Sequence, residues 1–245
     1  MENTESLEIK IIDEVGREKL SELTSDYAES TLDFFTENEA LKDIPIFGTF
    51  FKIFKTVNNI KEQFFLKKLY KFLFHLKEIP LKNRIEFINN LEEDKQRVGE
   101  KILILIDKLD DLDKPKMISN LFKATIEEKI SYQEFLIISN AVSNSYINDL
   151  KELKREFVPY DIQERLSHFG IFAISIDTDS TKRNSYKMNE IDNIPTEKQI
   201  TFQIMAKSNP LNFREKIREK NQEISISLIF KRTLIGDKII EYCFE

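Results

Sequence analysis

Two aspartates, Asp177 and Asp179, follow the apolar segment IFAISI. Of the residue pairs in this chain, their types and spacing best suit a catalytic reaction. Two neighbouring carboxylates can divide a reaction between them, one acting as nucleophile and the other transferring a proton. The apolar segment has the length of a strand, so both aspartates are expected just beyond a strand end. The alternative interpretation is a strand that leaves into a solvated turn of Asp, Ser and Thr residues.

With Thr181, these aspartates form a D-x-D-x-T motif that resembles the motif of haloacid-dehalogenase-type phosphatases. In that family the first aspartate attacks phosphorus and the second protonates the leaving group, so the resemblance implies a magnesium-dependent phosphatase. The family also has a Rossmann-like sheet, a downstream lysine and an acidic pair for magnesium. After Thr181, only Gly236-Asp237 faintly matches the rest of that pattern. We therefore assign no catalytic residue, and the phosphatase stays as an alternative.

Four aspartates between positions 107 and 113 have the composition of a calcium loop. They are Asp107, Asp110, Asp111 and Asp113. A calcium loop needs oxygen ligands at alternate positions and a glycine at the sixth. Counted from Asp111, Pro115 stands at the fifth position. The run therefore predicts the polar side and end of a helix, and we expect no metal.

The two histidines, His75 and His168, have no serine or cysteine nucleophile in a recognisable turn nearby. Both are expected near helix C-termini, where a positive charge is favourable. Cys243 lies in an apolar stretch and is expected to be a small core residue. We expect no cofactor, and the protein is predicted not to be an enzyme.

Composition favours a folded, mainly helical protein. The 245 residues are 41% hydrophobic and 33% charged, with only five glycines and six prolines. One cysteine excludes an intramolecular disulfide, and the net charge of −6 argues against broad nucleic-acid binding. The acidic start MENTESLEIK has no apolar core, and no apolar run is long enough for a spanning helix. The expected location is the cytoplasm.

A phenylalanine- and lysine-rich stretch predicts a long basic amphipathic helix over 46–79. Its apolar residues recur in steps of three and four, which marks one helix face. The lysines expected on the other face are Lys52, Lys55, Lys61, Lys67, Lys68 and Lys71. Three interpretations stay open: a core helix with solvated lysines, a protein-docking face, or peripheral attachment to an anionic membrane surface. The core interpretation predicts burial of Ile53, Val57, Phe64, Leu69 and Phe72.

The remaining patterns divide the chain into two regions. Residues 1–157 are predicted to be a multi-helix bundle, with a first helix over 5–39 and a capping box at Ser131 and Glu134. Residues 158–245 are predicted to be a small α+β region, with a helix ending at Gly170 and strands in IFAISID, ITFQIMA and EISISLIFKR. The segment GDKIIEYCF fits either a helix or a strand. The fold class is therefore mainly α with a small α+β region.

The same region contains a short basic helix, SNPLNFREKIREK. Nucleic-acid binding by this tail would use Arg214, Lys216, Arg218 and Lys220. We treat nucleic acid as the less favoured partner, because the whole chain is acidic.

Two stretches of the chain resemble parts of known kinds of protein. The segment LDDLDKPKMISNLFKATIEEKISYQEFLIISNAVSNSYINDLKEL resembles part of uncharacterised bacterial helical proteins, and FKRTLIGDKIIEYC is similar to the end of such proteins and of many winged-helix domains. Those proteins often occur in genomic islands and near phage-defence genes, so the resemblance implies a defence or mobile-element context. Here Thr233-Leu234 reverses the usual Leu-Thr order, and no functional residue is carried over. The predicted function is a non-enzymatic interaction or regulatory protein that binds another protein.

Overall fold

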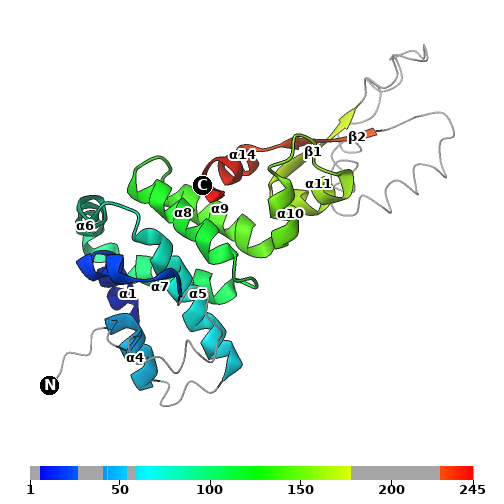
Figure 1. The fold of residues 1–245 in the computed structure, drawn as a ribbon. Helices are drawn as coiled ribbons and strands as arrows, with labels where there is room; N and C mark the ends of the chain where they lie inside the picture. The colour runs from blue at the N-terminus through cyan, green and yellow to red at the C-terminus, as the bar shows by residue number, and fades with distance from the viewer. Residues whose placement is uncertain (1–5, 27–40, 43, 54–58, 178–226, 245) are drawn as a thin grey trace, which may run out of the picture. The chain divides into compact units, whose positions relative to one another are not determined.

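A computed structural model of the chain describes residues 6–26, 41–42, 44–53, 59–177 and 227–244 (Figure 1). The fold is mainly helical, with one small antiparallel sheet in the described part. Two compact units are present. The first comprises residues up to Val158 together with the segment that begins at Leu234, and the second spans Pro159–Thr233.

The first unit is helical throughout its described residues. Its elements are α1 (Leu7–Val15), η1 (Glu18–Glu22), α4 (Pro45–Ile53), α5 (Ile60–Leu76), α6 (Leu81–Asn90), η3 (Glu92–Asp94), α7 (Lys95–Lys108), α8 (Lys114–Ile126), α9 (Tyr132–Asn144), α10 (Ile147–Glu152) and α14 (Leu234–Cys243). Helix α5 packs against α7 and α8, and α1 packs against α7 (Figure 1).

Large apolar side chains fill the interior of this unit. The rings of Phe72, Phe122 and Phe135 are fully buried and follow one another across α5, α8 and α9, with centroids 5.9 and 5.3 Å apart. The crossing of α1 over α7 is also close, because a Cβ atom on Gly99 would lie 1.9 Å from the main-chain oxygen of Glu8. Only glycine fits there without a backbone shift. The core therefore has α5 and α8 at its centre.

The long helix predicted over 46–79 is wrong, because two helices cover this stretch. Helix α4 ends at Ile53 and α5 begins at Ile60. Asn59 is in an extended conformation and its side chain accepts a hydrogen bond from the amide of Lys61 at 3.0 Å, as an N-cap residue does. The apolar spacing continues across this start, so spacing alone cannot detect it.

The burial predicted for the core face of this stretch is mixed. Leu69 and Phe72 are fully buried, whereas Phe64 in the first turns of α5 is 39% exposed. The side chains of Ile53 and Val57 lie outside the described residues. The second half of α5 is thus a core helix, and its first turns reach the surface.

The single helix predicted over 5–39 is also wrong in its described part. Helix α1 ends at Val15, and Gly16 caps it with an amide hydrogen bond to the main-chain oxygen of Asp13. A short 3₁₀ helix follows, and Leu23 is extended. Residues 27–40 lie outside the described part of the chain.

The capping box predicted at the start of α9 is confirmed. The amide of Glu134 donates to the Ser131 hydroxyl at 3.2 Å, and the Glu134 carboxylate accepts from the Ser131 amide at 2.9 Å. Both amides would otherwise lack a partner at the helix end.

The second unit consists, in its described residues, of α11 (Tyr160–Ser167), β1 (Phe172–Asp177) and β2 (Ser227–Arg232). The strands pair antiparallel, with Phe172 opposite Arg232. Gly170 has φ 76°, and the following amide of Ile171 bonds to the Leu166 oxygen at 3.2 Å, so the predicted glycine cap is confirmed. The strand predicted in IFAISID is present, and so is the described part, 227–232, of the strand predicted in EISISLIFKR. The segment ITFQIMA lies outside the described residues.

The C-terminal segment, for which the sequence allowed a helix or a strand, is the helix α14. It packs on α8 and α9 of the first unit (Figure 1). Ile239 and Cys243 are buried, Lys238 forms an ion pair with Glu134, and the Asn120 amide donates to the Cys243 oxygen at 3.3 Å. The division into 1–157 and 158–245 therefore misses that α14 returns to the helical unit.

Candidate functional site, a lysine-lined pocket

A cavity of about 360 Å³ opens in the first unit among residues of α5, α8, α10, α14 and the loop before α8. We call it the basic pocket. Its polar lining is Lys71, His75, Asp113, Lys116, Lys151 and Lys154. Its apolar lining is Leu112, Met117, Ile147, Cys243 and Phe244.

The pocket has an apolar floor and a charged rim. Met117, Ile147 and Cys243 are at most 7% exposed, so they form the interior surface. Lys116 and Lys151 are exposed to solvent. Small-molecule and side-chain sites commonly combine an apolar interior with a few polar groups at defined places.

The four lysines of the pocket differ in the contacts that their ammonium groups make. The Lys71 ammonium donates to the Leu112 oxygen at 3.1 Å, and Lys151 forms an ion pair with Asp113 at 2.7 Å. The Lys154 ammonium lies 5.3 Å from the centre of the Phe244 ring. Lys116 makes no hydrogen bond or ion pair with any residue that the structure describes. Cationic groups are therefore available at the rim.

The electrostatics of the pocket are dominated by positive charge. Four lysines and one aspartate belong to its described lining, an excess of three positive charges. The hydrogen bond from Lys151 lowers the pKa of Asp113, and the same contact raises the pKa of Lys151. Both groups are therefore charged at neutral pH, and the pair cancels only one of the lysines.

His75 at the end of α5 is half-buried in this positive surrounding. Burial lowers the pKa of His75, and the charge of Lys116 lowers it further, while Glu78 opposes them. Its imidazole is neutral at pH 7 because its ordinary pKa of about 6.5 is already below that value. A neutral ring can donate one hydrogen bond and accept another, so His75 adds a polar contact without adding charge.

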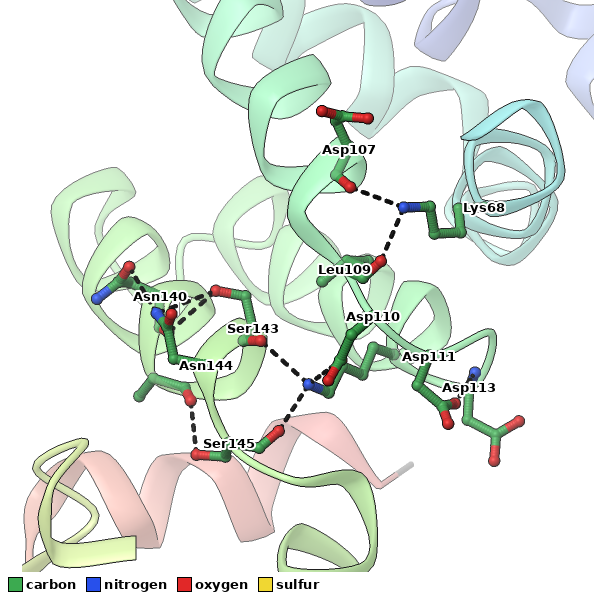
Figure 2. Close-up of polar contacts among 12 residues, drawn as sticks. Lys68, Asp107, Leu109, Asp110, Asp111, Asp113, Asn140, Ser143, Asn144 and Ser145 are labelled. Carbon is green, nitrogen blue, oxygen red and sulfur yellow. Dashed lines mark hydrogen bonds and ion pairs between the residues drawn. The ribbon is translucent and has the colours of Figure 1, made fainter. Parts of the chain in front are cut away.

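Two buried lysines, Lys68 and Lys114, hold the loop that carries Leu112 and Asp113 of the pocket wall. Figure 2 shows the contacts of Lys68 with the main-chain oxygens of Asp107 and Leu109. From α5, the Lys68 ammonium donates to the main-chain oxygens of Asp107 at 2.8 Å and Leu109 at 2.7 Å. Burial lowers the pKa of Lys68. These bonds attach the end of α7 and the start of the following loop to α5.

Lys114 fixes the other end of the loop. Its side chain is completely buried, and its ammonium donates to the oxygens of Ser143 at 3.0 Å and Ser145 at 2.6 Å, and to the Asp110 carboxylate at 2.5 Å (Figure 2). We call Lys68, Lys114 and these oxygen acceptors the buried-lysine network. Because it holds the loop 109–113 from two sides, it defines the position of one pocket wall.

The acidic run in this loop is part of the network and of turn structure. The Asp111 carboxylate accepts from the amide of Asp113 at 2.7 Å, and Asp110 contacts Lys114 (Figure 2). Within the described ranges, no group of three acidic, histidine or cysteine side chains is arranged to hold a metal ion. The acidic residues therefore belong to the turn between the end of α7 and the start of α8.

The lysine row predicted for 46–79 is distributed over different environments. Lys52 and Lys61 are exposed, and Lys71 is half-buried at the basic pocket. Lys67 and Lys68 are only 7% exposed, so their assignment to a partner or membrane surface needs correction. They lie on the buried side because α5 is covered by neighbouring elements on more than one face. Lys55 lies outside the described residues.

The other candidate residues are placed as follows. Asp177 is the last residue of β1, but its side chain and the whole of Asp179 lie outside the described part of the chain. His168 is the residue that follows α11 as its C-cap, which is a helix-end position. The proposed nucleic-acid residues Arg214, Lys216, Arg218 and Lys220 also fall outside the described residues.

Sequence reasoning missed most of the basic pocket. Lys116 comes from α8, Lys151 from α10 and Lys154 from the turn that follows α10, and they meet Lys71 only through the fold. The three-residue spacing of Lys151 and Lys154 is the one local signal in the sequence, and it does not identify a pocket because α10 ends before Lys154. No spacing connects them to α5.

Comparisons with protein-family models, with curated proteins and with solved structures found no match to this chain. Across the residues described, every helix is too short or too polar to cross a lipid bilayer.

Proposed function

We propose that this chain is a non-enzymatic interaction protein that binds an acidic segment of a partner protein at the basic pocket. The observation that carries this proposal is the excess of positive charge around an apolar cavity. Exposed cations attract an acidic partner over distances near the Debye length, about 10 Å at 0.1 M salt, and an apolar floor adds affinity when a side chain enters it.

The proposed role also agrees with the rigidity of the site. The buried-lysine network fixes the pocket wall, and α14 brings Cys243 and Phe244 to it through its packing on α8 and α9. A preformed site loses less conformational entropy on binding than one that must order itself. The defence or mobile-element context stays part of the proposal, and genome neighbourhood of the coding sequence is its test.

The test uses a synthetic peptide that alternates glutamate and leucine, with binding followed by fluorescence anisotropy. We expect the double substitution Lys116→Glu with Lys154→Glu to weaken binding at least tenfold. The matched control is Lys82→Glu with Lys101→Glu, which reverses two exposed charges outside the pocket. Binding by the unmodified chain should also weaken as salt rises. Equal losses in both double variants would contradict the proposal.

A second candidate is peripheral binding to an anionic membrane through the first turns of α5. Here Ile60 is 65% exposed and Phe64 is 39% exposed, and the exposed Lys61 lies between them. Apolar and basic side chains at one surface suit the interface of an anionic bilayer. Co-sedimentation with vesicles rich in phosphatidylserine at low salt, and its loss in Ile60→Ser with Phe64→Ser, would support this candidate.

A further inference from the structure

We infer that the basic pocket is built for a phosphate monoester carried on an apolar, ring-sized group. The inference rests on the proposed function and specifies its ligand, because such a group can be a phosphorylated aromatic side chain of the partner or a free aryl phosphate. Three features of the pocket lead to it: the amount of charge, the type and placement of the cations, and the apolar floor.

The amount of charge favours a doubly charged group. The described lining has an excess of three positive charges, and one carboxylate would neutralise only one of them. A phosphate monoester has a charge between about −1.5 and −2 at pH 7. It therefore balances more of this charge from a single position than a glutamate or aspartate does.

The type and placement of the cations favour a tetrahedral group. The pocket has lysines and no arginine among its described lining, and they come from α5, from α8 and from α10 with the residues directly after it. A lysine ammonium is a point charge that can approach phosphate oxygens from varied directions, without the planar geometry that an arginine fork imposes. Three separate origins fit the three terminal oxygens of a phosphate monoester, and the neutral His75 can add a hydrogen bond.

The floor favours an apolar group behind the phosphate. Met117 and Ile147 line the interior, and the Phe244 ring stands at the side where Lys154 approaches. A volume of about 360 Å³ lies within the range of small-molecule sites, so a phenyl ring can enter without displacing the walls. Inorganic phosphate alone would leave this apolar surface in contact with water.

The experiment is isothermal titration calorimetry of the full chain with four probes: phenyl phosphate, benzoate, inorganic phosphate, and a glutamate-rich peptide containing one phosphotyrosine. We expect phenyl phosphate to bind at least tenfold more tightly than benzoate and than inorganic phosphate. Phe244→Ala should weaken phenyl phosphate and leave inorganic phosphate unchanged. Lys116→Ala should weaken every phosphate probe, and the exposed Lys82→Ala should weaken none.

The outcomes separate this inference from the proposed function. Benzoate binding as tightly as phenyl phosphate, or inorganic phosphate binding equally well, would overturn the inference. If the glutamate–leucine peptide still binds in that case, the proposed function stands. If phenyl phosphate binds and neither peptide does, the inference stands for a free ligand and the partner-protein function falls. Acetylation footprinting locates the site, because bound phenyl phosphate should protect Lys116, Lys151 and Lys154 and leave Lys82 reactive.

Discussion

The buried-lysine network and the basic pocket use the same side chain in opposite ways, although Lys114 and Lys116 are only two residues apart on α8. The Lys114 ammonium is enclosed and has three oxygen acceptors, two of them main-chain carbonyls. The Lys116 side chain points to an open cavity and has no hydrogen bond or ion pair within the described part of the protein. For this pair of lysines, the difference is whether main-chain carbonyls lie within hydrogen-bond reach of the ammonium.

The physical basis of this difference is desolvation. Moving an ammonium out of water is expensive unless hydrogen bonds replace the lost hydration. Unpaired carbonyls at helix ends need donors as well, so a lysine placed there satisfies two requirements at once. Lys116 at the rim keeps its water, and its charge is available to the ligand that we propose.

The largest expected effect is the loss of stability in Lys114→Met. Methionine is of similar length, but it leaves the buried oxygens of Ser143 and Ser145 without a donor, which costs about 2–4 kcal/mol in total. Urea denaturation followed by circular dichroism measures this loss. Lys116→Met on the same helix is the matched control and should change stability by less than about 0.5 kcal/mol. If both variants lose the same amount of stability, the proposed difference between the buried-lysine network and the basic pocket is wrong.

The next effect is expected for Lys68→Met. This variant removes the donor to the oxygens of Asp107 and Leu109, and we expect a loss of about 1–3 kcal/mol in the free energy of unfolding. Because the pocket wall follows directly, binding of phenyl phosphate should weaken too. Lys61→Met, at an exposed position of the same helix, should alter neither quantity. A Lys68→Met variant as stable as the parent would show that these bonds do not hold the loop.

A smaller effect is expected from acid, through the ion pair that docks α14. The hydrogen bond from Lys238 and those from Ser131 lower the pKa of Glu134 to about 2. A carboxyl group whose pKa is lower in the folded state than the ordinary 4.5 stabilises the fold above pH 4.5, and this contribution disappears as pH falls toward 2. The docking of α14 should therefore loosen over that interval.

Cys243 reports on this docking because it is the last residue of α14 and is buried, and burial raises the pKa of its thiol. We expect the rate of its reaction with a dipyridyl disulfide, divided at each pH by the rate of a free thiol, to rise as pH falls from 4.5 to 2. In Glu134→Gln this rate ratio should already be higher at pH 7 and should change little as pH falls. A rate that follows the same pH profile in both proteins would mean that another group controls the docking.

The smallest effect on stability is expected for the double substitution Lys52→Glu with Lys61→Glu. Both lysines are exposed, and exposed charges contribute little, so the free energy of unfolding should change by less than about 1 kcal/mol. Binding of phenyl phosphate should also be unchanged, because neither residue lines the basic pocket. If this variant loses capture of the glutamate–leucine peptide while the pocket variants retain it, the docking surface lies on α4 and α5 instead.

Signals that act over a few residues allowed correct prediction of local structure. The capping box at Ser131, the glycine cap at Gly170 and the strand β1, expected from an apolar segment of strand length, each depend on neighbours in the chain, and each is present. The start of α5 at Asn59 was missed because the three- and four-residue spacing continues across it. Its one sign was an asparagine, which is common both within loops and at caps.

The site was less predictable than the fold because its parts are distant in sequence. The carbonyls that hold Lys68 and Lys114 belong to the main chain, which every residue type carries, so no sequence motif marks them. The same residue type therefore appears buried at Lys67 and exposed at Lys61 within one helix. The basic pocket spans positions 71 to 244, and the spacing of residues along the chain gives no measure of that proximity.

The return of α14 to the helical unit has a consequence for the order of synthesis. The ribosome makes the whole of the second unit, residues 159–233, before it reaches the helix that covers α8 and α9. Until then, the surfaces that receive Ile239 and Cys243 are open to water, and a nascent chain in this state exposes apolar area that invites aggregation. The basic pocket also lacks Phe244 during this interval. The basic pocket is therefore complete only after both units have been translated.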